Sequence, residues 1–419
     1  MKTKTTLVFL VTACLLAMSL VGTALIPREA IRDRMKVSAE FLCEGKQFEP
    51  FVEHVNSTRI DRYADAMLLG IAWAYDEHDP IRSVLVSRYY ENELQNASQN
   101  LLDAVTQDLP ANQQYLRYWH GSAGIVRALM TFLTLPQIYV WHGVILTLLA
   151  AGVLLRLALR KDWMMLIGMG TGLIGTAFWL VPLSLEFTWV FLILLTQIHL
   201  VLTQRWLREW RMRQLVFLVS GMVLCFLDFL TCETLTLLVP LLFLLRRDEQ
   251  EGLPSVKTLL KAAGYWAIGY SGMYLLKWGL AGIVMGENPL PYVAAHVGER
   301  LAGSVGELSF FQLIIGALIR NVTSLFPLDY DLAGALIGIT LAISAGYIGY
   351  VHHRKDYDKR RVTIYAALGM VPYVRYLVLV NHSYLHSFFT YRAQFATLLA
   401  LVMILSDLTG WGRMTHGKT

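Results

Sequence analysis

Ten long apolar runs constrain this chain more than any other feature of its sequence. The runs cover residues 7–26, 137–157, 163–181, 187–204, 213–230, 232–246, 260–284, 331–350, 362–380 and 387–406. A run of about 20 apolar residues can cross the hydrocarbon core of a bilayer as one α-helix. Only 16% of the residues are charged, whereas soluble domains carry about 25%. The sequence therefore predicts an all-α polytopic membrane protein with about ten transmembrane helices, in which residues 1–419 form a single membrane domain.

The basic residues between these runs predict the orientation of the chain. Lys and Arg concentrate in the cytoplasmic links of membrane proteins. The links richest in Lys and Arg are residues 156–161, 205–213, 246–247 and 352–361. They are alternate links, so all four face the cytoplasm if the apolar segment 308–326 does not cross the membrane. The sequence leaves that point open, because Arg320 and Asn321 interrupt this segment. Both termini are then expected in the cytoplasm.

Two segments are expected on the other side of the membrane. Residues 27–135 form one long loop after the first run, and residues 285–330 form a second outer segment. The first run is interpreted as an uncleaved span, because it is long for the apolar part of a signal peptide. A cleaved signal peptide remains the alternative, since small residues follow at positions 22–24.

The four cysteines do not form a pattern typical of a disulfide framework or of a CxxC metal site. Cys14 and Cys43 lie far from the other two in the sequence. Cys225 and Cys232 are separated by about two helical turns, or about 10 Å. That separation is too large for a disulfide within one helix, so we expect neither feature.

Two acids in the outer loop are candidates for chemistry. The stretch "RIDRYADAMLLGIAWAYD" (59–76) predicts an amphipathic helix in which Asp61 and Asp65 share one face. One interpretation is a solvated helix start, with acids near the positive end of the helix dipole. The other is that one aspartate faces a cavity as a general base or a metal ligand.

A second stretch of the outer loop, "YLRYWHGSAGIVRALMTF" (115–132), leads into the second run. Its aromatic residues are typical of the membrane interface. His120 is either an interfacial histidine without a role or part of a site. Arg127 either extends its charge toward water or binds a phosphate group.

Four ionisable residues lie in or beside apolar runs, where a charge is costly and suggests a function. Asp228 and Glu233 lie in "DFLTCETLTLLVPL" (228–241), where a short, water-facing turn is the alternative. Lys277 has no charged neighbour in sequence, and Arg375 lies near the end of another run. Both cations need a partner, which a phosphate group would provide, and Asp228 is the alternative partner of Lys277.

The stretch "NHSYLHSFFTYR" (381–392) places several polar groups between the last two runs. Asn381, His382, His386 and Arg392 are its candidate binding residues. The two histidines have the spacing of metal ligands on one helix, but no third ligand is evident. An interfacial belt of aromatic rings is the alternative interpretation. The acidic "LDYD" (328–331) is a second weak indication of a divalent ion.

Several of these strings resemble known membrane proteins. They are "DRYADAMLL" (61–69), "RYWHG" (117–121), "DFLTCETLTLLVPL" (228–241), "LLKWGL" (275–280) and "NHSYLHSFFTYR" (381–392). Together with the long outer loop after the first run, they are similar to a group of uncharacterised polytopic proteins of Gram-positive bacteria. That group lies within or near the GT-C superfamily of membrane glycosyltransferases. The strings follow in order across most of the chain.

The resemblance implies a bacterial plasma-membrane enzyme whose active site faces outward. It would transfer a sugar from a polyprenyl-phosphate donor to a cell-envelope polymer, a glycolipid or a protein. Asp61 would be the general base, with Asp65 second. Lys277, Arg375 and Arg392 would bind the donor phosphate, while His120, His382 and His386 would line the pocket.

The chain departs from this pattern at the start of its outer loop, which lacks the paired-acid motif of several superfamily members. No cofactor is therefore predicted with certainty, and dependence on a divalent metal stays open. The predicted partners are the lipid-linked donor and membrane lipid, with no nucleic acid, and the oligomeric state is undetermined. A transporter or flippase for a lipid-linked sugar or another anionic amphiphile is the alternative function. A non-catalytic scaffold ranks last, because it would not need isolated charges within the membrane.

Overall fold

The computed structural model describes residues 2–93, 96–251, 256–326 and 332–411. This part of the chain is mostly helical. Its short strands form two isolated antiparallel pairs: β1 (Phe48–Pro50) with β2 (Arg59–Asp61), and β3 (Arg88–Tyr89) with β4 (Gln113–Gln114). The predicted all-α class is confirmed.

Each predicted apolar run coincides with a helix. The helices are α1 (Lys2–Ala24), α7 (Leu135–Leu159), α8 (Trp163–Gly175), α9 (Leu185–Thr203), α10 (Trp210–Leu227), α11 (Leu235–Glu251), α12 (Val256–Met285), α15 (Leu332–Val351), α16 (Lys359–Val378) and α19 (Phe395–Thr409). Over the described ranges, five helical segments are long and apolar enough to cross a membrane: Lys4–Ala24, Leu135–Leu159, Leu185–Thr203, Trp210–Leu227 and Ser387–Thr409. The total of ten spans stays a prediction.

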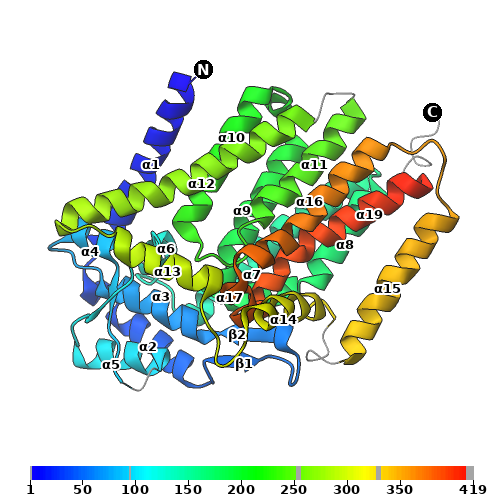
Figure 1. Cartoon of the computed structure of the whole chain (residues 1–419). Helices are drawn as coiled ribbons and strands as arrows, with labels where there is room; N and C mark the ends of the chain where they lie inside the picture. The colour runs from blue at the N-terminus through cyan, green and yellow to red at the C-terminus, as the bar shows by residue number, and fades with distance from the viewer. Residues whose placement is uncertain (1, 94–95, 252–255, 327–331, 412–419) are drawn as a thin grey trace.

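The predicted outer loop forms a compact layer at one end of the helical bundle (Figure 1). Its helices are α2 (Arg32–Cys43), α3 (Arg62–Ala74), α4 (Pro80–Val86), α5 (Ala97–Gln107) and α6 (Gly121–Leu129). Helix α1 begins and helix α19 ends at the opposite end of the bundle (Figure 1). The side of the membrane on which the termini and the long loop lie stays a prediction.

The second outer segment lies at the same end as this layer. It contains α13 (Leu290–Ala302) and α14 (Phe310–Thr323). Helix α14 covers most of the apolar segment whose crossing the sequence left open. It runs across the end of the bundle beside α17 (Val380–Leu385), which is followed by the short α18 (Ser387–Thr390) (Figure 1).

Local sequence signals fix where the helices begin. The Gln137 side chain accepts a hydrogen bond from the Thr134 backbone N–H at 2.9 Å, and Pro136 occupies the first turn of α7. Both features are typical of a helix N-terminus. Helix α3 begins one residue after Asp61, whose side chain accepts a hydrogen bond from the Ala64 N–H. Asp61 therefore serves as the N-cap of α3.

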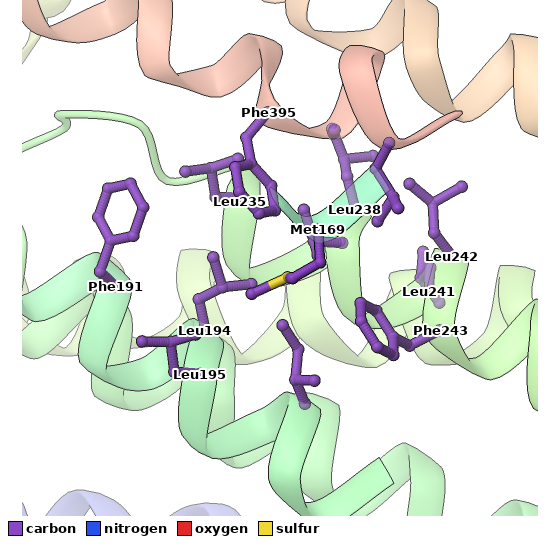
Figure 2. Packing of buried hydrophobic residues seen from close by; sticks show 14 of the residues in the cluster. Met169, Phe191, Leu194, Leu195, Leu235, Leu238, Leu241, Leu242, Phe243 and Phe395 are labelled. Carbon is purple, nitrogen blue, oxygen red and sulfur yellow. The ribbon is translucent and has the colours of Figure 1, made fainter. Parts of the chain in front are cut away.

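The largest hydrophobic core joins α8, α9, α11 and α19. Met169 of α8 lies among Leu194 of α9, Leu235 and Leu238 of α11, and Phe395 of α19 (Figure 2). Helices in a bilayer associate through such close packing, because lipid tails are as apolar as the side chains themselves.

Two glycines bring α10 and α12 into direct backbone contact. A side chain at Gly221 would collide with the backbone of Trp266, and one at Gly269 would collide with the backbone of Leu218. Small residues permit this close approach between membrane helices. The contact fixes α12, which carries several aromatic residues described below.

Candidate functional site

A pocket of about 110 Å³ lies where the outer layer meets the bundle. Asp61 and the first turns of α3 form one wall, and the segment before α6 forms another. The start of α9, the helix α13 and the α17–α18 segment complete it. Its acidic, basic and histidine lining residues are Asp61, His120, Glu186, Arg300, His382 and His386. The pocket thus joins segments that are distant in the sequence.

Two acids form the centre of this pocket. Asp61 and Glu186 are 3% and 6% exposed, and both line the pocket with their carboxyl groups close enough to influence each other's ionisation. Two buried carboxylates near each other repel, which favours a proton on one of them. Burial raises the pKa of Asp61 to about 6. At neutral pH the pair is therefore expected to hold one proton and one negative charge.

The tautomer of His386 follows from its partner. Its Nε2 lies 3.2 Å from a guanidinium nitrogen of Arg300. A guanidinium only donates hydrogen bonds, so Nε2 accepts this one and the ring is neutral. Burial and, to a smaller extent, the nearby Arg300 together lower the pKa of His386 to about 3.

His120 has the opposite tautomer. Its Nε2 lies 3.0 Å from the carbonyl oxygen of Tyr115, and a carbonyl only accepts, so Nε2 carries the proton. Burial lowers the pKa of His120 to about 3, which leaves Nδ1 as a bare acceptor. His120 also has a left-handed backbone with φ of 56°, a conformation that non-glycine residues adopt infrequently.

Within the described part of the chain, four of the lining side chains carry buried polar atoms without a partner. These atoms are His120 Nδ1, His382 Nδ1, Glu186 Oε2 and Arg300 Nε. A buried polar atom that makes no hydrogen bond costs about 1–3 kcal/mol. These atoms leave hydrogen-bonding capacity around one cavity that a ligand with several polar groups could satisfy.

An aromatic pocket of about 190 Å³ adjoins this polar pocket, and the two share Tyr118 and Arg300. Tyr270, Tyr274 and Trp278 of α12 contribute most of its aromatic surface, and Arg117 adds a second cation. The rings form a continuous series, with centroids 5.3 Å apart for Tyr270 and Tyr274 and 5.4 Å for Tyr274 and Trp278. An apolar surface that ends at two arginines suits an anionic group attached to a hydrocarbon tail.

Asp65 does not line the pocket but fixes one of its walls. Its carboxylate accepts hydrogen bonds from the Ser184 hydroxyl at 3.1 Å and from the Leu185 N–H at 2.9 Å. The Tyr139 hydroxyl donates a further short hydrogen bond. Asp65 therefore caps the start of α9 and positions Glu186 one residue later.

Lys277 and Arg127 are buried and bonded to backbone carbonyls. Lys277 Nζ donates to the carbonyl oxygens of Val84 and Leu85 at 3.1 and 2.7 Å, at the end of α4. Arg127 donates to the carbonyl oxygens of Ala72 and Ile26. Both cations attach the outer layer to the bundle, and the structure places neither of them in the pocket.

Arg375 and Glu233 form a buried, bidentate ion pair. Arg375 Nε and one terminal nitrogen donate to the two Glu233 oxygens at 2.7 and 2.9 Å. Asp228 accepts hydrogen bonds from the backbone N–H groups of Leu230 and Thr231. These three predicted residues thus organise the α10–α11 turn, which places Phe229 in the pocket wall.

The remaining predicted residues surround the pocket without lining it. Asn381 donates to the Gly303 carbonyl at 3.1 Å, and its own oxygen is buried without a partner. Arg392 donates to the carbonyl oxygens of Thr176 and Phe388, both at 3.2 Å. Of the predicted phosphate-binding cations, then, none lines the pocket.

Sequence reasoning missed Glu186, Arg300 and Arg117. Glu186 was identifiable, because it is the only acid between residues 163 and 208 and it lies at the start of an apolar run. Arg300 and Arg117 lie in ordinary polar stretches, so no local signal separates them from surface arginines.

The described part of the chain contains no cluster of three or more His, Cys, Asp or Glu residues arranged to hold a metal ion. The acidic stretch 328–331 lies outside the described residues. All four cysteines are free.

The fold and the apolar helices define an all-α protein with helices able to span a membrane. Beyond this class, no known protein family, no curated protein and no solved structure matches the chain.

Proposed function

We propose that this chain is a membrane glycosyltransferase of the bacterial plasma membrane. It transfers a sugar from a polyprenyl-phosphate donor to an extracytoplasmic acceptor. The observation that carries the proposal is the Asp61–Glu186 pair in a pocket that continues into an aromatic, arginine-bearing pocket. The chain would cross the membrane about ten times, with both termini in the cytoplasm and the pocket facing outward.

In this proposal the two pockets bind the two parts of the donor. The phosphate lies between Arg117 and Arg300, since guanidinium groups match phosphate oxygens in charge and geometry. The hydrocarbon tail lies along Tyr270, Tyr274 and Trp278. The sugar enters the polar pocket, where His120 and His382 offer hydrogen bonds to its hydroxyl groups.

The carboxyl pair then removes the proton from the attacking hydroxyl. The acceptor oxygen forms a bond to the anomeric carbon as the bond from that carbon to the phosphate oxygen breaks. The acceptor proton moves to Asp61, and polyprenyl phosphate leaves with its negative charge balanced by the arginines. A general base works best when its pKa lies near the operating pH, and the raised pKa of Asp61 satisfies this condition.

The test is transfer of radiolabelled sugar from polyprenyl-phosphate donors in membranes that contain the full chain. Asp61→Asn and Arg300→Gln should each lower transfer by about 100-fold or more. Glu49→Gln is the matched control. Glu49 is an exposed acid on β1, which pairs with the strand β2 that carries Asp61, but Glu49 does not line the pocket.

Two outcomes would overturn the assignment. If no donor supports transfer by the wild type, or if Asp61→Asn retains full activity, the pair is not a catalytic base. Donor-dependent movement of labelled lipid between leaflets of vesicles, with no sugar transferred, would establish the flippase instead.

A further inference from the structure

A third pocket lies where α11 ends, at the end of the bundle opposite the outer layer; Figure 1 shows this end of the helix. It has a volume of about 330 Å³ and opens to the surface between the C-terminal ends of α7, α9 and α11 and the short 3₁₀ helix Arg205–Arg208. Its charged lining residues are Arg156, Arg160, Arg205, Arg208, Arg247 and Glu251. Five guanidinium groups thus face a single carboxylate.

That carboxylate is already shared by two of the arginines. Glu251 lies 3.0 Å from Arg208 and 3.3 Å from Arg247. Arg247 also donates to the Val201 carbonyl at 2.9 Å, and Arg160 donates to the carbonyl of Leu202. These contacts hold three of the guanidinium groups around the cavity but neutralise little of its positive charge.

Two further arginines have no partner of their own. Within the described ranges, the side chains of Arg156 and Arg205 make no hydrogen bond or ion pair. Like charges close together repel each other, and the repulsion is stronger near a low-dielectric bilayer than in water. An anionic ligand in this cavity would remove the repulsion.

The surroundings of the cavity indicate where that anion comes from. Leu155 and Leu159 of α7 are 60% and 74% exposed, and they alternate with the two arginines of the same helix. Trp206 and Trp210 are also exposed near the arginines. Exposed tryptophans mark the headgroup level of a membrane, and exposed leucines offer a surface for acyl chains.

We infer that this cavity binds the headgroup of an anionic phospholipid, with its acyl chains along the exposed face of α7. Basic pockets between transmembrane helices on the cytoplasmic side suit such headgroups. A headgroup with two phosphates matches the excess of positive charge better than one with a single phosphate. Diphosphatidylglycerol is therefore the preferred chemical class. The inference is independent of the chemistry at the outer pocket.

The experiment measures lipid binding to the purified full chain by native mass spectrometry. The lipids are diphosphatidylglycerol, phosphatidylglycerol and phosphatidylcholine, and inorganic pyrophosphate is added separately. The variant is the double substitution Arg156→Gln with Arg205→Gln, which removes no hydrogen bond of the described structure. The matched control is Lys355→Gln with Arg360→Gln, which removes two exposed charges outside the cavity.

Wild type and control should bind diphosphatidylglycerol equally, and the cavity variant should bind it about 10- to 30-fold more weakly. Phosphatidylcholine should bind all three proteins weakly. Equal losses in the cavity variant and the control would show a diffuse positive surface and overturn the inference. Binding of pyrophosphate as strong as that of the lipid would assign the cavity to a soluble anion. If the cavity variant does not fold, the wild type alone is compared with the two anionic lipids. Stronger binding of diphosphatidylglycerol than of phosphatidylglycerol then supports the inference, and equal binding refutes it.

Discussion

Replacing Asp61 by Asn should separate stability from activity at the pocket. Asp61 is an N-cap whose side chain accepts from the Ala64 N–H at 2.8 Å, and asparagine is an equally good N-cap. The substitution therefore keeps the helix start and removes only the ability to ionise. The variant should lose sugar transfer and yet be at least as stable as the wild type at neutral pH.

The size of the stability change follows from the pKa. An aspartate with a pKa of 3.8 in the unfolded chain and about 6 in the folded chain retains its proton more strongly when folded. The protonated Asp61 carboxyl therefore makes its full contribution to stability at about pH 4 and below. This contribution is lost as the pH rises through about 6. A shift of this size corresponds to about 1–3 kcal/mol. Asp61→Asn should therefore match the wild type near pH 4 and exceed it by about 1–3 kcal/mol at pH 8.

The assay is unfolding of the purified protein in mixed detergent at pH 4, 6 and 8, with transfer measured in parallel. Glu49→Gln should follow the wild type at each pH, because Glu49 is exposed. If Asp61→Asn is less stable than the wild type at pH 8, the charged carboxylate is stabilised by its surroundings and the argument from burial is wrong. Transfer by the wild type should also decrease below about pH 6 as Asp61 gains a proton.

Three further substitutions test how the pocket is supported. Lys277→Met should lower the free energy of unfolding by about 1–3 kcal/mol, because the carbonyls of Val84 and Leu85 lose their donor. Proteolysis near α4 should then accelerate, and an unchanged rate of proteolysis would contradict this role. Glu233→Gln should cost about 3–5 kcal/mol by leaving Arg375 buried without its ion pair, whereas Glu233→Leu combined with Arg375→Leu should cost less than Glu233→Gln in the same unfolding assay. Gly221→Ala should destabilise the α10–α12 contact by about 1–3 kcal/mol, which a lower thermal midpoint of unfolding would show. Gly264→Ala is the control, because a side chain there meets open space, and it should leave the midpoint almost unchanged.

Local patterns predicted the helices and part of the candidate site. Each apolar run became a helix, since the length of a run and the absence of charge are properties of neighbouring residues. The histidines were selected because polar groups between apolar runs suggest a function, and three of them line the pocket together with Asp61. Whether these residues act in catalysis stays a prediction.

The sequence by itself determined an all-α chain with apolar helices and a long polar loop, because hydrophobicity and helix signals act over a few turns. Only the tertiary structure decided which polar groups meet. It paired Asp61 with Glu186, placed Arg300 beside His386, and engaged Lys277 and Arg375 in contacts that hold the fold. The partner of a buried charge lies on a distant segment, so its identity depends on how the helices pack rather than on the residues around it.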